Sequence, residues 1–505
     1  MAIVSCHESS RYDGLLVKSL LDGKGVFLCV LLIGLLAMAA RNAVDPDLWW
    51  HLKTGQYIAE HKGVPHVDPF SYTRSGAPWV AHEWLTELLL YQLERISGFA
   101  GLIVLFASII SAAFVLLYLR CGTNPSVAGV ATLVAAWATA SLWGVRPQML
   151  SLLLTSLWLL LLEESERRPR LLWWTIPLTL LWVNLHAGFA VGLALSALFL
   201  AGECFEAVWL QLSRGLPQPN SSQLRHAAFI LVLDLLMVPL NPNGLRLFSY
   251  PIETLRSAAM QGYIVEWASP NFHRAEYLPF LLLVLGTFAV LSLRWVRVRP
   301  RDLLLLLTGL YAGLVSIRML PLFALIAAPV LSKGLAQWRL RSRPDLVMRI
   351  RRSLPSSHLL LNALIVVGMA GFAAVHLAQV IQRQPEAEAR QFPERAVAYL
   401  RDHPASGAIF NDYDWGGYLI WKLYPSTQVF IDGRADLYGE EFLDQYADTY
   451  QLKGDWRHPL ERWHIHTVLV PCDSALAVGL GNVPNWSVAY QDSQAVILTD
   501  QVSPR

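Results

Sequence analysis

Long apolar stretches recur along the chain from residue 26 to residue 380, with polar connections between them. A helix that crosses the roughly 30 Å hydrocarbon core of a bilayer needs about 20 mostly apolar residues. The pattern therefore predicts a multi-spanning α-helical membrane protein with about 11 transmembrane helices. We expect these helices at residues 26–40, 98–119, 127–142, 149–162, 171–183, 190–210, 227–240, 278–293, 303–316, 320–331 and 359–380.

After Gln382 the pattern changes, because a polar linker leads into a region without any further spanning segment. Short β-rich runs alternate there with helical stretches, which predicts a small α/β domain. The β-rich runs are 408–411, 428–432, 467–470, 487–490 and 495–499, and the helical stretches are 393–401 and 439–450. We therefore divide the chain into a transmembrane domain, residues 1–382, and a C-terminal domain, residues 383–505.

Basic side chains gather in alternate connections, within residues 167–170, 294–301 and 333–352. The positive-inside rule places such connections in the cytoplasm. A bacterial-type cytoplasmic (inner) membrane is the expected location, with a cytoplasmic N-terminus. The loops 42–97 and 241–277 and the C-terminal domain are then extracytoplasmic. The first apolar run follows Lys18 and Lys24 and ends in Ala-Met-Ala-Ala, so a cleavable signal peptide is an alternative interpretation.

Composition narrows the class of protein. Of 505 residues, 54% are hydrophobic and 15% are charged, against about 25% charged in soluble proteins, which excludes a soluble globular enzyme. The formal net charge of +2 gives no basic excess for a nucleic-acid partner. The five cysteines are dispersed without a CxxC pair, so neither a zinc site nor a disulfide framework is predicted.

The first outer loop is dense in carboxylate, imidazole and indole side chains. Asp45, followed by proline, suits the N-cap of a helix, and this structural role alone is one interpretation of the residue. Asp47 and His51 lie four residues apart and would share one face of that helix. A base and its helper would then point into one cleft. The candidates of this loop are Asp45 and Asp47 as catalytic carboxylates, and His51, His82 and Glu83 as cleft residues.

Two arginines, Arg146 and Arg318, end predicted spanning helices on the same outer side. A guanidinium near the hydrocarbon boundary is costly unless it snorkels or meets an anion. Either arginine alone is compatible with snorkelling, but two beside an Asp-rich loop suit the oxygens of a phosphate. His186, Asn241 and Glu266 also lie at outer helix ends or loops and complete the predicted cleft. Asp234, inside an apolar run, is interpreted as a structural contact within the bundle.

The first loop resembles that of the GT-C superfamily of polyprenyl-phosphate-dependent glycosyltransferases, in which an acidic motif follows the first spanning helix. Asp45-Pro-Asp47 is the matching motif, and the stretch from Trp50 to Pro69 is similar to oligosaccharyltransferase, protein O-mannosyltransferase and aminoarabinose-transferase relatives. The resemblance implies inverting transfer of a sugar from a polyprenyl-phosphate-linked donor to an extracytoplasmic acceptor. An Asp would act as base, and cations would stabilise the departing phosphate.

A second likeness lies in the C-terminal domain, where Asn411-Asp-Tyr-Asp-Trp-Gly-Gly-Tyr resembles the acceptor motif of oligosaccharyltransferases. The residues that this likeness marks for acceptor binding are Asp412, Asp414, Trp415, Asp432 and Arg434. The family's second acidic motif is missing from residues 143–148. The cofactor requirement therefore stays open between none and a divalent cation, Mg²⁺ or Mn²⁺, held by Asp45 and Asp47.

Two other functions fit the same spanning pattern. A lipid-glycan flippase or transporter would place polar groups at mid-bilayer on several helices. A non-catalytic, membrane-anchored protein would bind an envelope partner through its C-terminal domain. The predicted partners of the favoured function are the lipid bilayer, a polyprenyl-phosphate-linked sugar and an unidentified protein, glycan or lipid acceptor.

Overall fold

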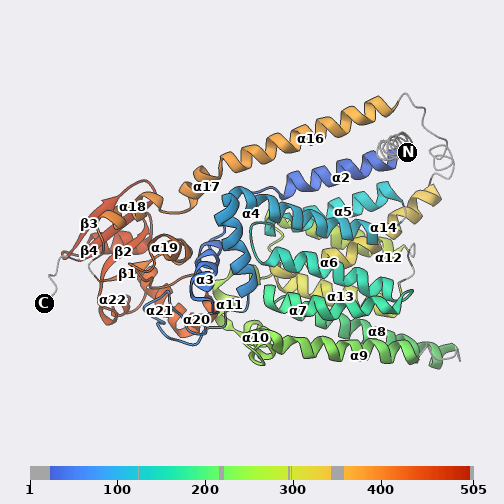
Figure 1. The fold of residues 1–505 in the computed structure, drawn as a ribbon, viewed down its shortest axis with the longest axis horizontal. Coiled ribbons are helices and arrows are strands. Elements are labelled where there is room, and N and C mark those ends of the chain that lie inside the picture. Colours follow the sequence, from blue (N-terminus) through green and yellow to red (C-terminus); the bar gives the residue numbers. More distant parts are fainter. Residues whose placement is uncertain are drawn as a thin grey trace, which may run out of the picture.

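The computed structural model describes residues 23–122, 124–214, 221–293, 296, 298–342, 358–405 and 407–500. Helices of the first part lie side by side as a bundle, and the part that carries the β-sheet sits at one end of it (Figure 1). The basic residues Lys18, Arg294 and Arg297, and the part of the basic stretch beyond residue 342, lie outside the described residues.

Each predicted apolar segment forms a helix, which confirms the multi-spanning class. Within the described residues, eight helices are long and apolar enough to cross a membrane. Three further segments form shorter helices, which are α2 (Gly23–Ala39), α7 (Thr175–Leu185) and α13 (Pro300–Val315). The longer bundle helices are α4 (Trp84–Arg120), α5 (Pro125–Thr139, continued by Ala140–Leu142), α6 (Gln148–Ser165), α8 (Phe189–Arg214), α9 (Ser221–Met237), α12 (Leu278–Ser292), α14 (Leu320–Ser342) and α16 (His358–Gln382).

Helix α4 joins the first outer loop to the bundle. It contains one non-helical residue, Gly98, with φ 61°. A positive φ strains other residues, so glycine suits this break. Residues 84–97 thus form a separate helical arm, and the apolar part predicted to span begins at the break. The remaining helix of this loop, α3 (Leu48–His61), packs against α4.

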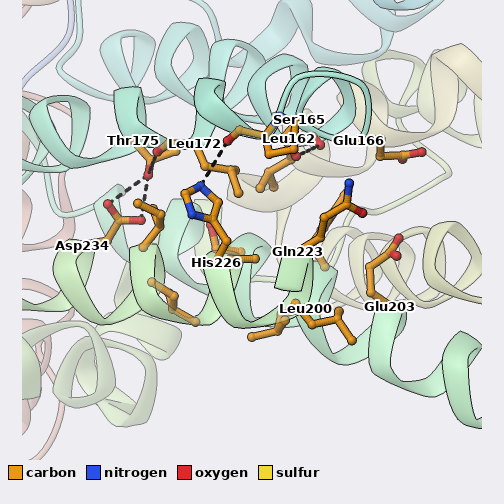
Figure 2. Close-up of a pocket in the computed structure, with 17 residues that line it drawn as sticks. Leu162, Ser165, Glu166, Leu172, Thr175, Leu200, Glu203, Gln223, His226 and Asp234 are labelled. Atoms are coloured by element: carbon orange, nitrogen blue, oxygen red, sulfur yellow. Dashed lines mark hydrogen bonds between the residues drawn. The ribbon is translucent and has the colours of Figure 1, made fainter. Parts of the chain in front are cut away.

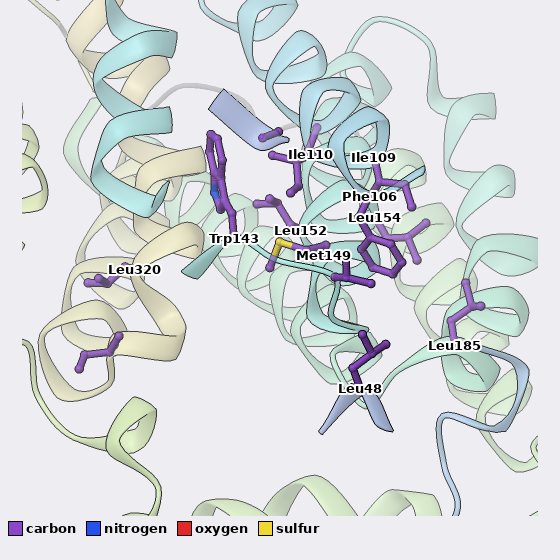
Figure 3. Packing of buried hydrophobic residues seen from close by; sticks show 14 of the residues in the cluster. Leu48, Phe106, Ile109, Ile110, Trp143, Met149, Leu152, Leu154, Leu185 and Leu320 are labelled. Carbon is purple, nitrogen blue, oxygen red and sulfur yellow. The ribbon is translucent and has the colours of Figure 1, made fainter. Parts of the chain in front are cut away.

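The start of α3 packs against the apolar core of the bundle. Figure 3 shows Leu48, the first residue of α3, among Phe106 of α4, Met149 of α6 and Leu185 of α7. Leu48 is 1% exposed. Burying such a side chain contributes about 1.5–3 kcal/mol. The residues just before Leu48, Asp45 to Asp47, are therefore held at one end of the bundle.

The C-terminal part contains a four-stranded sheet of order β1-β2-β4-β3. Strands β1 (Ala408–Asn411) and β2 (Ile465–Pro471) are parallel, whereas β4 (Ala495–Asp500) runs antiparallel to β2 and to β3 (Trp486–Gln491). The predicted helical stretches are confirmed as α18 (Glu394–Asp402) and α21 (Glu440–Tyr450). The other helices here are α17 (Gln384–Gln391), α19 (Gly416–Leu423), α20 (Ala435–Tyr438), α22 (His458–Arg462) and α23 (Ala475–Gly481).

One predicted strand, 428–432, was wrong. These residues do not join the sheet; Val429 instead forms an isolated bridge with Ser71 of the first outer loop. The β-rich run that suggested a sheet strand reflects burial, since Val429, Phe430 and Ile431 are all buried. This segment therefore fastens the C-terminal part to the first loop.

An enclosed ion cluster, which we call the Arg434 cluster (Asp68, Asp432 and Arg434), strengthens the same junction. Arg434 lies 2.7 Å from Asp68 Oδ1 and 2.7 Å from Asp432 Oδ2, and its Nε donates to Asp432 Oδ1 at 2.7 Å. All three side chains are almost completely buried. Asp68 belongs to the first loop, so the cluster joins residues far apart in sequence.

Candidate active site

The Asp45-Pro-Asp47 motif forms a tight turn at the start of α3. The Asp45 carboxylate accepts a hydrogen bond from the Asp47 backbone N–H at 3.0 Å, and the Asp47 carboxylate accepts one from Trp50 Nε1 at 3.0 Å. The prediction of Asp45 as the N-cap was wrong: the N-cap residue of α3 is Asp47, whose side chain makes no capping hydrogen bond, and the Asp45 carboxylate instead holds the turn before the helix. Burial and the neighbouring charge of Asp45 raise the pKa of Asp47 from 3.8 to about 7. Its carboxyl group thus titrates near neutral pH.

Two arginines converge on this turn and on one glutamate, and we call this group the Arg146–Arg318 cluster (Asp45, Arg146, Glu266 and Arg318). Arg146 Nε lies 2.7 Å from Asp45 Oδ2, and its Nη1 contacts Glu266 Oε1. Arg318 Nη2 donates to Glu266 Oε2 at 3.0 Å. Against the effect of burial, Arg146 and Arg318 hold the pKa of Glu266 below its ordinary value. The predicted meeting of these helix ends is therefore present.

A cavity of about 120 Å³ opens beside the Arg146–Arg318 cluster. Its charged lining residues are Arg146, Glu266 and Arg318, with His186 beside them. The other walls are mostly apolar and extend along α6 as far as Thr155. The apolar lining includes Leu142, Met149, Leu152, Val191, Leu322 and Leu325. Such a cavity offers cations to an anionic head group and apolar walls to an attached chain.

Next to this cavity, Glu83 is surrounded by three imidazoles. Its carboxylate lies 3.1 Å from His82 Nε2, 3.4 Å from His186 Nε2 and 3.5 Å from His51 Nε2. Burial alone would favour the neutral acid, but His186 and His82 hold the pKa of Glu83 below its ordinary range. Four predicted cleft residues are therefore one contiguous polar group, which begins one helical turn after Asp47.

Hydrogen-bond geometry assigns the protons in this group. His186 Nδ1 accepts from the Gly188 backbone N–H at 2.8 Å, so His186 Nε2 carries the hydrogen that faces Glu83. Both ring nitrogens of His82 face acceptors, the Val80 carbonyl at 3.2 Å and Glu83 at 3.1 Å. Burial opposes a charge on His82, but Glu83 raises its pKa. By contrast, burial lowers the pKa of His51 and of His186 to about 4. Of the three imidazoles, His82 is thus the one whose protonated form Glu83 favours.

The C-terminal domain reaches the Asp47 carboxylate through Gly433 and Tyr413. A Cβ atom on Gly433 would lie 1.8 Å from Asp47 Oδ1, so only glycine fits at this distance. The Tyr413 hydroxyl donates to the Gly433 carbonyl at 3.3 Å. Burial, and then the charge of Asp47, raise the pKa of Tyr413. Asp47 is therefore enclosed between two parts of the chain that are more than 350 residues apart.

A second contact with the C-terminal domain lies on the other side of the polar group. The Tyr250 ring lies 4.5 Å from that of His82, centroid to centroid, and its hydroxyl donates to Asp436 Oδ2 at 3.2 Å. Asn241, a predicted cleft residue, is buried and donates to the Val183 carbonyl at 3.0 Å. Its amide thus holds the loop that follows α9 against the end of α7.

The residues marked for acceptor binding are placed differently from one another. Asp414 is largely exposed to solvent. Partial desolvation by its neighbours, and then the charge of Asp45, raise the pKa of Asp414, so it lies near the Asp45 turn. Asp412 accepts from Tyr450 at 2.7 Å, and Trp415 is buried and donates to the Gln391 carbonyl at 3.2 Å. Asp432 and Arg434 belong to the enclosed Arg434 cluster. Among these five, Asp414 alone lies open beside the cleft.

Solved structures share this arrangement of helices and C-terminal domain. The chain is similar to the archaeal oligosaccharyltransferase AglB from Archaeoglobus fulgidus in complex with an inhibitory peptide and a dolichol-phosphate, with 12% identity, 88% of this chain and 69% of that chain covered, and a TM-score of 0.57. It is also similar to ArnT from Cupriavidus metallidurans bound to undecaprenyl phosphate, with 14% identity, 94% and 98% covered, and a TM-score of 0.52. Both are GT-C superfamily proteins. The chain has the GT-C fold.

No protein-family model matches the sequence, and no curated protein matches it. At identities of 12–14% the likeness to the two solved structures concerns the fold. The GT-C resemblance read from the first loop is thereby confirmed at the level of architecture.

Within this GT-C fold, several site residues were missed by the sequence analysis. Glu87 contacts His51 at 3.2 Å, and its spacing of four residues from Glu83 on a helix was the available signal. Tyr250, Tyr413, Gly433 and Asp436 carried no signal in isolation, because their positions depend on how distant segments meet. Among the residues that the structure describes, no three His, Cys, Asp or Glu side chains gather in a metal-binding arrangement.

Proposed function

We propose that this protein is a membrane glycosyltransferase that moves a sugar from a polyprenyl-phosphate-linked donor to an extracytoplasmic acceptor with inversion. The observation that carries the proposal is the convergence of Arg146 and Arg318 at an apolar cavity directly beside the Asp45-Pro-Asp47 turn. The cavity has cations for a phosphate and apolar walls for a polyprenyl chain. The turn supplies the carboxylates that transfer to a hydroxyl requires.

Asp47 is our candidate for the general base. A base works best when its pKa lies near the operating pH, and burial beside Asp45 brings Asp47 to about 7. Asp45 is occupied by Arg146 and by the Asp47 backbone, which suits an orienting role. In the reaction, the acceptor oxygen forms a bond to the anomeric carbon as Asp47 takes the hydroxyl proton. The anomeric carbon–phosphate oxygen bond breaks in the same step.

The departing polyprenyl phosphate gains negative charge at its bridging oxygen. Arg146 and Arg318 are placed to stabilise this charge, since fixed cations aimed at a developing oxyanion lower the barrier. Both guanidinium groups contact Glu266, and we infer that the donor phosphate competes with this carboxylate for them. Proton transfer and stabilisation of the phosphate are thus both assigned to side chains of this chain.

The proposal also requires that the site face the extracytoplasmic side of the membrane. We propose that the Asp45 turn, the loop 241–277 and the C-terminal domain, residues 383–505, face the extracytoplasmic side. The basis is the positive-inside rule applied to the connections 167–170, 294–301 and 333–352. Addition of a membrane-impermeant thiol reagent to cells that carry a new cysteine at exposed Asp402 tests this orientation. Labelling in intact cells supports it, and labelling only after lysis contradicts it.

Incubation of the purified full-length protein with a panel of labelled polyprenyl-phosphate sugars and a membrane extract tests the reaction class. We expect one donor to yield a labelled product, and Asp47→Asn to lower its formation by about 10²- to 10⁴-fold. Asp402→Asn removes an exposed carboxylate at the end of α18 and serves as the matched control. Equal product formation by wild type and Asp47→Asn contradicts the assignment of the base.

The same preparation in sealed vesicles distinguishes transport from transfer. A flippase moves the labelled lipid across the bilayer without forming a new covalent product. A transferase releases polyprenyl phosphate in step with glycosylated acceptor. Translocation without a covalent product, at the same rate in wild type and Asp47→Asn, would overturn the proposed function in favour of transport.

A further inference from the structure

Helix α9 has one side toward the interior of the bundle and one side away from it. Toward the interior, Figure 2 shows Asp234 and His226 beside a cavity between α6, α7, α8 and α9. The Asp234 carboxylate accepts a hydrogen bond from the Thr175 hydroxyl at 2.9 Å, so this buried acid is a contact within the bundle. The residues on the other side of α9 and just beyond its end are apolar and exposed; they are Phe229, Val232, Leu236 and Leu240. In a spanning helix such a side faces the acyl chains of the bilayer.

Helix α10 (Arg246–Arg256) follows soon after the lipid-facing side of α9 ends. The apolar segment Ser222–Leu240 has 19 residues, and a helix of that length covers about 28 Å, close to the thickness of the hydrocarbon core. Figure 1 shows α10 beyond this segment, beside α11 (Ala258–Tyr263), at the end of the bundle that meets the C-terminal part. The start of α10 therefore lies at the level of the lipid head groups.

The side chains of α10 fall into three faces, because successive residues of an α-helix are about 100° apart. One face packs on the protein, with Leu247 and Tyr250 buried. A second face is polar and exposed, and its residues are Arg246, Ser249, Glu253 and Arg256. The third face is apolar and exposed, and with the residue before the helix included it comprises Leu245, Phe248, Ile252 and Leu255.

This third face, which we call the α10 apolar face, is unusual for a surface in contact with water. The exposed fractions of its four residues are 72%, 41%, 52% and 54%. Single exposed apolar side chains are common, but a stripe of four between a buried face and a charged face marks an interaction surface. The exposed residues Leu236 and Leu240 of the lipid-facing side precede it directly in the chain. The bilayer that covers α9 is thus the nearest partner for this face.

We propose that α10 is a membrane-interface helix, with the α10 apolar face in the bilayer at the boundary between head groups and acyl chains. Helices of this kind bury their apolar face roughly 5–10 Å into that boundary. Arg246 and Arg256 on the neighbouring polar face are then placed to reach lipid phosphates, since long basic side chains keep their charged ends in the head-group layer. The partner of this face is therefore a phospholipid surface.

The protein face of α10 links this membrane contact to the candidate active site. The Tyr250 ring lies 4.5 Å from that of His82, centroid to centroid, and its hydroxyl donates to Asp436 Oδ2 at 3.2 Å. One helix thus contacts the bilayer, the first loop and the C-terminal domain. It therefore sets the height of the polar group around Glu83 relative to the lipid surface.

Photolabelling of the wild-type full-length protein tests the proposal. The protein is placed in phosphatidylcholine nanodiscs in which a small fraction of the lipid carries a benzophenone on an acyl chain. After irradiation, trypsin releases the peptide Leu247–Arg256, because Arg246 precedes it and Arg256 ends it. We expect this peptide to be labelled at least about tenfold more than the peptide that carries Val478 and Val488, because an interfacial helix reaches the acyl chains.

Two comparison peptides make the outcome decisive. Val478 and Val488 are 60% and 54% exposed in the C-terminal domain, so they match the α10 apolar face in exposure. The peptide with Leu282 and Leu285, exposed on the spanning helix α12, shows that the reagent labels lipid-facing residues. Labelling of the α10 peptide no higher than that of the Val478 peptide, while the α12 peptide is labelled, overturns the proposal.

The position of the label and a second measurement sharpen the test. Fragment spectra should place the label on Phe248, Ile252 and Leu255, and equal labelling of Ser249 and Glu253 contradicts the orientation. In the second measurement, p-benzoyl-phenylalanine replaces Phe248. An adduct with the mass of one lipid supports the bilayer as partner, whereas an adduct with a second copy of this chain assigns the face to a protein contact and overturns the proposal. Neither measurement uses product formation, so both are independent of the proposed transferase activity.

Discussion

Two arginine clusters connect distant segments of this chain, and they differ in how completely their polar atoms are satisfied. In the Arg434 cluster every guanidinium nitrogen meets a carboxylate oxygen at 2.7 Å, and the side chains are at most 1% exposed. In the Arg146–Arg318 cluster the side chains are 15–25% exposed. Arg146 Nε meets Asp45 at ion-pair distance without a hydrogen-bond alignment.

The contrast separates a structural role from a role in binding. A buried, saturated ion cluster has no free direction for a ligand and resists any change of partner. A partly exposed cluster beside a cavity can exchange one anion for another, because solvent and space are available on one side. The Arg434 cluster therefore fastens the C-terminal domain to the first loop, whereas the Arg146–Arg318 cluster is suited to a phosphate.

The largest expected effect concerns the Arg434 cluster. Arg434→Met leaves Asp68 and Asp432 buried without their cation, which costs about 3–5 kcal/mol of unfolding free energy. Denaturant unfolding of the purified protein, followed through its tryptophans, measures this loss. Arg390→Met breaks an exposed pair with Glu386 and should cost less than about 0.5 kcal/mol. Equal stabilities of the two variants would show that the enclosed cluster does not hold the domains together.

Arg318→Met in the Arg146–Arg318 cluster should affect activity strongly and stability little, the reverse of what we expect for a structural cluster. We expect product formation to fall by about 10²- to 10³-fold, because a preorganised cation for the leaving phosphate is lost. Unfolding free energy should change by less than about 1 kcal/mol, since the pair with Glu266 is partly exposed. Arg274→Met, which breaks an exposed pair with Glu276, is the control. Full activity, or a loss of stability as large as that of Arg434→Met, contradicts the division of roles.

The helices of this protein could be predicted from the sequence, but the contacts between distant segments could not. Spanning helices follow from local hydrophobicity, so every apolar segment was found, including the part of α4 that begins at Gly98. The 428–432 run was misread as a sheet strand, because the sequence does not reveal that Val429 pairs with Ser71 of the first loop. The local pattern of apolar residues thus predicts helices and strands, but it does not predict which distant segment packs against them.

The same limit applies to the site. Asp45, Arg146 and Glu266 could be proposed because they are charged residues of the predicted outer loops and helix ends, and the structure brings them together. Asp432 and Arg434 were proposed from the likeness to an acceptor motif, yet both are enclosed. Gly433, which lies between these two residues in the sequence, packs closely against Asp47. Because glycine has no side chain, nothing in the sequence indicated this contact. Charge reveals candidates, whereas burial and contact decide their roles.

A smaller effect is expected at Glu266, which occupies both guanidinium groups. Glu266→Gln weakens its hold on Arg146 and Arg318, so the donor phosphate meets less competition. We expect the KM for the donor to fall by up to about tenfold, which corresponds to about 1.4 kcal/mol. Glu276→Gln, in the same loop, is the control. A rise in KM would mean that Glu266 supports donor binding instead of opposing it.

The smallest expected effect is a shift in the pH dependence of transfer. The pKa of Asp47 is raised to about 7, and the base must be ionised, so activity should be present above pH 7 and decline as the pH falls through that value. Asp45→Asn removes the like charge that helps to raise this pKa and frees Arg146, whose charge lowers it. Both changes favour ionised Asp47.

The acidic limb of kcat/KM should therefore move to lower pH in Asp45→Asn, by about one unit or less, since one unit corresponds to 1.36 kcal/mol of interaction. His82 also titrates close by, because Glu83 raises its pKa. His82→Gln distinguishes the titration of His82 from that of Asp47. If Asp47 is the titrating base, this variant should leave the acidic limb of kcat/KM unchanged. If the limb moves with His82→Gln and not with Asp45→Asn, the titrating group is the imidazolium, and the base assignment passes from Asp47 to the Glu83 group.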